Sequence, residues 1–323
     1  MEKGKQKRSM IVWALRILGT VLFLWLTFRS LDVREFFQQI QSLPFISYFL
    51  LFLLFLFNQL LTAWRWKTLL NMTGIRAPLW GLTVAVLYGQ TINKILPSSI
   101  GGDSARIAYL FKAHPDQKTR ALSATLMDRF LSFVGLFLLG ALSLPFGMAF
   151  PAAQRWLAEG ALFLIFGVIA AVYWGYLDQV VTAVMEWKHL PEKAAEIISR
   201  LWKVFLVFRE QKPAVLGAVG ISLLRQGLMV LNLFLLLRLL GVSVTLVDMY
   251  LVVPVVTILV ILPISIGGIG VREAAWVSIL GISREAVLSF TLIRYSFVIL
   301  LPLLLLLEPL LFAGKKVEEI TLS

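Results

Sequence analysis

The stretch LPSSIGGDSAR, residues 96–106, occurs a second time as LPISIGGIGVR, residues 262–272. At an offset of 166 positions the two stretches share seven of eleven residues, which chance does not readily produce. Each copy combines a proline, which cannot continue a helical hydrogen-bond ladder, with a Gly-Gly pair that permits sharp turns. The chain therefore contains a duplicated unit, and each copy carries a broken helix. The predicted helix-break residues are Pro97, Gly101, Gly102, Pro263, Gly267 and Gly268.

Composition places the chain in a membrane. Of its 323 residues, 59% are hydrophobic and 15% are charged, with a mean hydropathy of +0.86. The hydrophobic fraction is far above that of soluble domains, so we predict an all-α polytopic membrane protein. The net charge of +12 comes from basic residues at the ends of apolar segments, which favours cytoplasmic anchoring over nucleic-acid binding. There is no cysteine and the two histidines lie in polar linkers, so we expect no metal site and no cofactor.

The apolar runs predict about six spanning helices and two re-entrant ones. A belt of Arg65, Trp66 and Lys67 ends the second run at the membrane interface. If residues 79–96 spanned the membrane, the basic connection from Arg106 to Arg120 would lie outside. A re-entrant segment keeps it inside, as the positive-inside tendency favours. The predicted spans are residues 10–28, 44–64, 121–150, 156–177, 213–240 and 286–312, and the re-entrant stretches are 79–96 and 244–263.

Residues 1–323 form a single integral membrane domain with two repeats, 10–150 and 156–312. Both repeats have the order span, span, broken piece, span, and they start from opposite faces, which predicts an inverted-topology repeat. The linker 178–212 mixes aromatic and basic residues, as in an amphipathic helix on the inner leaflet, although a solvated connector has a similar composition. Both termini are predicted to be cytoplasmic, and the membrane is predicted to be the plasma membrane.

The helix that follows each break predicts an anion site. Helix N-termini present free N–H groups, and Arg106 and Arg272 can each bind a phosphate bidentately. Arginines inside apolar segments need partners or a water-filled path, which applies to Arg129, Arg225 and Arg294. Alternatively, these arginines pair with carboxylates to fix helix packing, and for Arg225 both interpretations stay open. The candidate carboxylates are Asp103, Asp128, Glu273 and Glu308.

The site prediction assigns a role to each motif residue. Arg106 and Arg272 would bind a headgroup, while Asp103 and Glu273 would orient them or sense a cationic part of it. Arg129 and Arg294 would line the path. The predicted substrate-binding residues are Asn93, Lys94, Asp103, Arg106, Arg129, Arg272, Glu273 and Arg294, and no catalytic residue is predicted.

With these motifs, the chain resembles the flippase-like transmembrane domain of lysylphosphatidylglycerol synthases (multiple peptide resistance factors) and their stand-alone relatives. The resemblance covers about residues 10–312 and implies a plasma-membrane protein that handles lipids. The best-known members of the family move an aminoacylated phospholipid between leaflets. Fused members of the family carry a soluble aminoacyl-transferase domain, whereas this chain stops at Ser323, so lipid synthesis is not expected of it. The resemblance rests on the motif residues Pro97, Gly101, Gly102, Asp103, Arg106, Asp128, Arg129, Pro263, Gly267, Gly268, Arg272, Glu273 and Arg294.

We therefore expect a lipid translocase for an anionic or phosphate-containing lipid, and not an enzyme. The alternative is a membrane-embedded enzyme or accessory subunit that modifies a phospholipid or polyprenyl-phosphate lipid. Such an enzyme needs carboxylates close together, whereas those of this chain are few and spread over both repeats. A third alternative is a scaffold for an envelope enzyme. Membrane lipids are the expected partners, nucleic acid is not, and a dimer is one assembly that the sequence allows.

Overall fold

The computed structural model describes residues 32–95, 101–144, 176–185, 206–261 and 268–306, together with a few isolated residues between these ranges. Within them the chain forms helices and no strand, which confirms the all-α prediction. Three helical segments are long and apolar enough to cross a membrane, Phe45–Met72, Pro115–Ser143 and Lys212–Leu239. The predicted spans at residues 10–28 and 156–177 lie outside the continuous described ranges.

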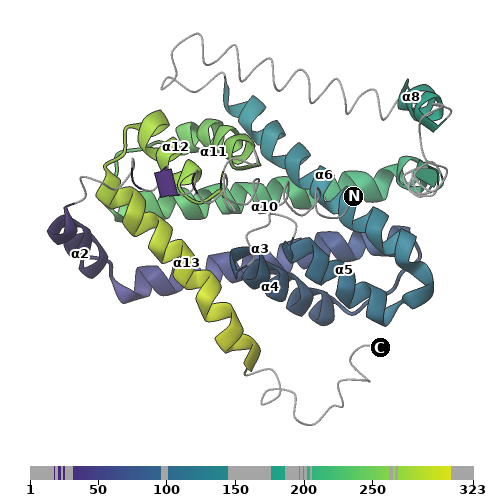
Figure 1. Ribbon diagram of the computed structural model, residues 1–323, viewed down its shortest axis with the longest axis horizontal. Helices are drawn as coiled ribbons and strands as arrows, with labels where there is room; N and C mark the ends of the chain where they lie inside the picture. Colours follow the sequence, from purple (N-terminus) through teal and green to yellow (C-terminus); the bar gives the residue numbers. More distant parts are fainter. Residues whose placement is uncertain are drawn as a thin grey trace, which may run out of the picture.

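Two equally long helices form the centre of the bundle. Helices α3 (Phe45–Met72) and α10 (Lys212–Leu239) have 28 residues each and pack against one another (Figure 1). At about 1.5 Å per residue each is ~42 Å long, more than the ~30 Å of a hydrocarbon core.

The two long helices also end in the same way. Gly74 and Gly241 follow them with φ of 83° and 79°, in the left-handed region where glycine has no steric penalty. The N–H groups of Ile75 and Val242 donate to the carbonyls of Leu70 and Leu237, at 3.0 Å in both cases. This is the Schellman ending of a helix.

The second span extends beyond the residue where the sequence analysis ended it. Helix α3 continues to Met72, and the side chains of Arg65 and Trp66 within it are fully buried. The indole nitrogen of Trp66 donates to Thr125 Oγ1 at 3.2 Å. The prediction of an exposed belt at Arg65 and Trp66 is therefore wrong, because both side chains find polar partners inside the bundle.

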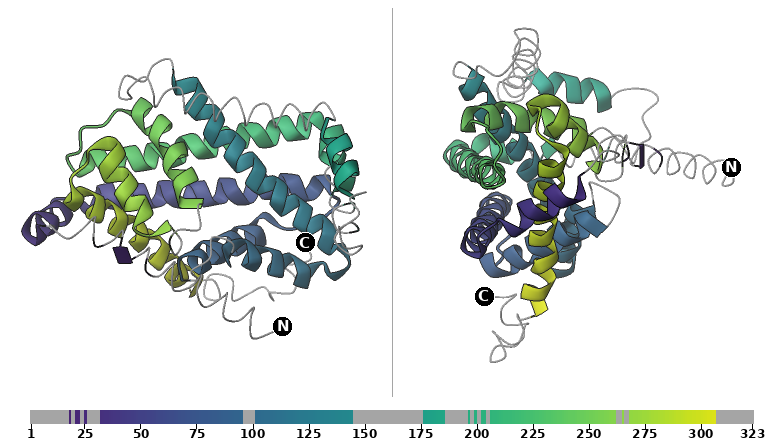
Figure 2. Two further views of the ribbon diagram at one scale, coloured as in Figure 1. Left: turned by 45° about the horizontal axis from the view of Figure 1, so that its top comes forward. Right: turned by 90° about the vertical axis from the view of Figure 1, so that its left-hand side faces the viewer.

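Each copy of the repeated motif separates two helices that pack against each other. Helix α4 (Leu79–Ile95) pairs with α5 (Gly101–Ala113), and α11 (Leu246–Ile261) pairs with α12 (Val271–Leu280). The two hairpins lie toward opposite ends of the α3–α10 pair (Figures 1 and 2). The predicted helix breaks at Pro97, Pro263 and Gly267 lie outside the described residues and stay predictions.

A further helix follows each hairpin. After the short 3-10 turn η1 (Pro115–Gln117), helix α6 (Lys118–Ser143) packs against α11, and α13 (Arg284–Leu306) packs against α4. These two contacts hold the N-terminal and C-terminal halves of the chain together. The short helix α2 (Val33–Gln41) packs on α13.

The linker 178–212 is described only in part. Helix α8 (Tyr176–Met185) covers its first residues and α10 begins at Lys212, while most of the residues between lie outside the described ranges. An ion pair of 2.9 Å between Asp178 and Arg209 joins its two ends.

The α4–α5 hairpin depends on a close approach at Gly102. The carboxamide oxygen of Asn93 accepts the N–H of Gly102 at 2.7 Å. A Cβ atom at Gly102 would overlap the carbonyl oxygen of Gly89 and lie 2.5 Å from the Asn93 amide nitrogen. Asn93, a predicted substrate ligand, therefore contributes to holding the hairpin together.

Replacing Gly102 by alanine is expected to lower the free energy of unfolding by about 1–3 kcal/mol, because the new methyl group meets backbone that cannot move aside. The matched control is Gly220→Ala in α10, where a Cβ meets nothing within 4 Å and helix propensity improves. Thermal unfolding in mild detergent measures both. Equal melting temperatures for the two variants would contradict this packing.

Candidate functional site

Two arginines share one buried aspartate in the first half of the molecule. Arg65 Nε of α3 lies 2.8 Å from Asp128 Oδ1 of α6, and Arg106 Nη2 of α5 lies 3.0 Å from Asp128 Oδ2. The remaining nitrogens of Arg65 donate to Ser222 Oγ of α10 at 2.7 Å and to Ser132 Oγ of α6 at 2.6 Å. The Arg65 guanidinium thereby joins α3, α6 and α10, and each of its three nitrogens has a partner.

A second aspartate extends this network. Asp103 lies 3.5 Å from Arg106 and forms an ion pair with Arg129. The guanidinium carbon of Arg106 also lies 4.1 Å from the centroid of the Trp66 ring, within range for a cation–π contact. We call Arg65, Asp103, Arg106, Asp128 and Arg129 the first-half ion cluster, in which three arginines face two aspartates.

The Glu273 side chain caps the N-terminus of α12, the helix that follows the second motif. Gly270 and Gly268 precede α12 with φ of 82° and 76°. The N–H of Gly270 donates to Glu273 Oε2 at 2.7 Å, and the Thr291 hydroxyl donates to Oε1 at 3.1 Å. The predicted helix start near Gly270 is confirmed, and both oxygens of the Glu273 carboxylate already accept a hydrogen bond.

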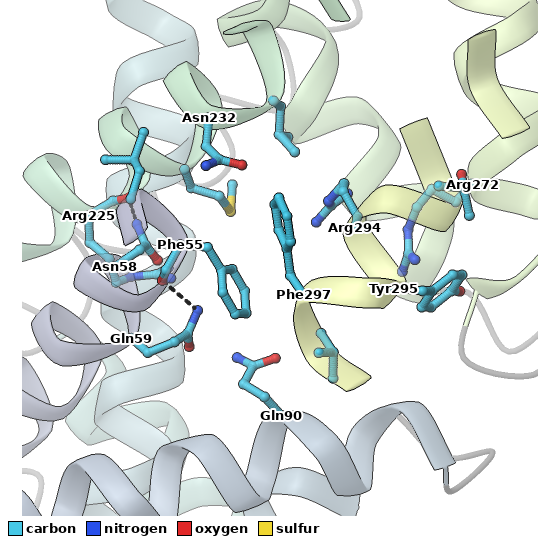
Figure 3. A pocket seen from close by; sticks show the side chains of 15 residues that line it. Phe55, Asn58, Gln59, Gln90, Arg225, Asn232, Arg272, Arg294, Tyr295 and Phe297 are labelled. Atoms are coloured by element: carbon cyan, nitrogen blue, oxygen red, sulfur yellow. Dashed lines mark hydrogen bonds between the residues drawn. The ribbon is translucent and has the colours of Figure 1, made fainter. Parts of the chain in front are cut away.

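A cavity of about 170 Å³ lies between the two halves, bounded by α3 and α4 on one side and by α10, α12 and α13 on the other. Its lining includes three arginines and four amides, and no carboxylate is among the described residues that line it (Figure 3). A cavity needs only about 10–15 Å³ to hold one water, so there is room for several waters or for a phosphate group. The polar lining residues are Asn58, Gln59, Gln90, Arg225, Asn232, Arg272, Thr291, Arg294 and Tyr295.

The arginines enter the cavity from two sides. Arg225 lies on one wall and Arg294 on the other, with Phe55 and Phe297 between them, while the Arg272 side chain runs toward Tyr295 (Figure 3). The two phenylalanine ring centroids are 5.8 Å apart. Nε of Arg225 is buried and has no hydrogen-bond partner among the described residues. Because a buried charge is costly without an anion or water beside it, this cavity favours an anionic occupant.

The structure divides the predicted site residues between these two places. Arg272 and Arg294 line the cavity, whereas Asp103, Arg106 and Arg129 belong to the first-half ion cluster. The side chain of Lys94 lies outside the described part of the chain. Among the described residues, no three metal-ligating side chains come together.

Sequence reasoning missed the cavity amides and the buried role of Arg65. A signal for them exists in the repeat, because α3 and α10 begin 167 residues apart, at Phe45 and Lys212. At this offset Asn58 falls opposite Arg225, and both line the cavity. Polar residues at equivalent depths of two apolar helices indicate a shared polar layer.

These features define a helical membrane protein with an arginine-lined cavity between its helices. A family model described as the lysylphosphatidylglycerol synthase TM region matches residues 11–306. The chain belongs to this family, which confirms the resemblance inferred from its motifs. A search of curated proteins found no match.

Replacing Asp128 by asparagine is expected to lower the free energy of unfolding by roughly 3–5 kcal/mol, because two buried guanidinium groups lose their shared anion. The control is Asp178→Asn, which breaks an ion pair whose side chains are 40% and 33% exposed and should cost at most about 1 kcal/mol. Chemical or thermal unfolding in detergent compares the two variants. A loss at Asp128 no larger than that at Asp178 would show that the cluster does not stabilise the bundle.

Proposed function

We propose that this protein is a lipid translocase that moves a lipid with an anionic or phosphate-containing headgroup between the leaflets of the plasma membrane. The observation that carries the proposal is the cavity, which is lined by three arginines within an apolar bundle and has no carboxylate among its described lining residues. Positive charge at this depth is rare and marks the path of a polar substrate. Membership of a family named for a phospholipid synthase supports a lipid as that substrate.

The internal repeat supports the transport mechanism. The two halves share long helices of equal length, identical helix endings and a hairpin at each motif. We propose that they form an inverted-topology repeat with re-entrant hairpins and both termini in the cytoplasm, an architecture in which the substrate binds at the repeat interface. The cavity, lined from both halves, has this location. Rocking of one half against the other would expose it to each leaflet in turn.

The site residues take different roles in this proposal from those predicted by sequence alone. Arg225, Arg272 and Arg294 hold the headgroup phosphate, and the amides around the cavity orient its remaining oxygens. Arg106 instead acts with Asp128 to hold α3, α5 and α6 together. The acyl or prenyl chains stay in hydrocarbon, because the cavity accommodates only a headgroup.

Leaflet exchange of labelled phosphatidylglycerol in proteoliposomes tests this function. The variants Arg272→Gln and Arg225→Gln should each slow exchange by at least about tenfold, because each removes a charge-assisted hydrogen bond worth ~1.5–3 kcal/mol. Arg238→Gln is the matched control, because Arg238 lies on α10 like Arg225 but is exposed at its end.

Exchange that is equal in the wild type, in both cavity variants and in protein-free liposomes would refute the proposal. Mass spectrometry of the same lipids separates the enzyme alternative, since a translocase leaves lipid masses unaltered. A changed mass that depends on the protein would favour the enzyme.

A further inference from the structure

Helix α2 is short and carries its apolar residues on one face. These residues are Val33, Phe36, Phe37 and Ile40. Their i, i+3, i+4, i+7 spacing places them on one side of a helix, while charged residues and glutamines occupy the remainder. The right-hand view of Figure 2 looks along α3, and α2 runs across this view. The helix therefore lies across the end of the bundle and does not continue along it.

Hydrogen bonds near both ends of α2 attach it to α13. The N–H of Asp32, just before the helix, donates to Glu285 Oε1 at 2.9 Å. Toward the other end, the Ser289 hydroxyl donates to Gln39 Oε1 at 3.1 Å. Phe36 lies between these two contacts in the sequence and is buried. The bundle therefore fixes the orientation of α2 and covers only part of its apolar face.

The rest of the apolar face of α2 is exposed. Val33 and Phe37 are 56% and 55% exposed. After residues 42–44, helix α3 begins with further exposed apolar side chains, those of Phe45, Ile46 and Phe49. Helix α3 is long and apolar enough to cross a membrane, so its exposed apolar side chains face lipid. The exposed face of α2 is thus followed directly by a lipid-facing helix.

We infer that α2 is an interfacial helix, which lies at the level of the lipid headgroups with Val33 and Phe37 inserted among the acyl chains. Glu35 and Gln38, on the other side of the helix, face water. A helix with one apolar face and one strongly polar face is the kind that binds in the plane of a membrane surface. The partner of this surface is a lipid leaflet, and the inference does not depend on the proposed translocase activity.

A second copy of the chain is a poorer occupant for this face. A phenylalanine side chain buries ~150–250 Å², whereas a stable protein interface buries ~1,000 Å² or more in total. The nine-residue helix α2 exposes only Val33 and Phe37 on its apolar face, which is too little for such an interface. A leaflet needs no minimum area of this kind, because the spanning helices already hold the protein in the membrane.

The attachment of α2 to α13 links the membrane surface to the cavity. Glu285 contacts the residue that precedes α2, and Arg294 follows it on the same helix. At 1.5 Å per residue Arg294 lies at most ~14 Å further along the helix axis, well within a hydrocarbon core of ~30 Å. The contact between α2 and the leaflet therefore sets the depth at which Arg294 lines the cavity.

Spin labels on single cysteines test the position of α2. The chain has no cysteine, so no native thiol has to be removed. Labels at Val33→Cys and Phe37→Cys are compared with labels at Glu35→Cys and Gln38→Cys, which lie on the polar side of the same helix. The protein is reconstituted in vesicles of phosphatidylcholine and phosphatidylglycerol. Collisions with oxygen, which is enriched in the membrane, and with a water-soluble nickel chelate give the depth of each label.

The labels at positions 33 and 37 should lie ~5–10 Å below the lipid phosphates, and those at positions 35 and 38 should be in water. Equal access of the nickel chelate to all four labels would overturn the inference. A label at position 37 that is shielded from both oxygen and nickel, with spin–spin broadening, would assign this face to a second copy and would also overturn it.

The variant Phe37→Glu tests which side chain holds α2 in the leaflet. A carboxylate at this position should move a label at Val33→Cys out of the acyl region and into water, because a charge is costly among acyl chains. The control is Gln41→Glu, which adds the same charge on the polar side of α2 and should leave the depth of the label unchanged.

The melting temperature in detergent separates this effect from unfolding. It should be the same for Phe37→Glu and the wild type, because the Phe37 side chain is exposed. A folded Phe37→Glu variant in which the label at position 33 keeps its depth would overturn the inference.

Discussion

The bundle depends on the compensation of positive charge inside an apolar interior. The Asp128 carboxylate lies between Arg65 and Arg106, and through them connects α3, α5 and α6, while Ser222 brings in α10. Breaking a buried ion pair of this kind costs several kcal/mol, since the partner left behind remains charged and away from water. The relative positions of four helices therefore follow from where these few polar groups must meet.

The arginines of the second half that line the cavity have a different environment from those of the ion cluster. No carboxylate is among the described residues that line the cavity, and the buried Nε of Arg225 has no hydrogen-bond partner among them. The ion network therefore lies within the first half, whereas the cavity lies between the two halves and is lined from both. This division explains why residues that look equivalent in the two motifs, such as Arg106 and Arg272, have different neighbours.

The sequence predicted the helical class and the family, because long apolar runs and the repeated proline and glycine motif act locally. It did not predict where the polar side chains meet. Arg65 follows an apolar run, so its sequence position resembles that of an interface anchor. Its side chain is instead buried, because it donates a hydrogen bond to Asp128, 63 residues away in the sequence. The sequence analysis gave Arg129 and Arg294 the same role, whereas the helix starts place Asp128 opposite Arg294.

The most direct test of the cavity as a headgroup site is an experimental structure of the protein in lipid nanodiscs that contain phosphatidylglycerol. The account predicts density for a headgroup phosphate within hydrogen-bonding distance of at least one of Arg225, Arg272 and Arg294, with no lipid phosphate at Arg106. A cavity closed by apolar side chains, or a phosphate bound at Arg106 while the cavity holds only water, would contradict it.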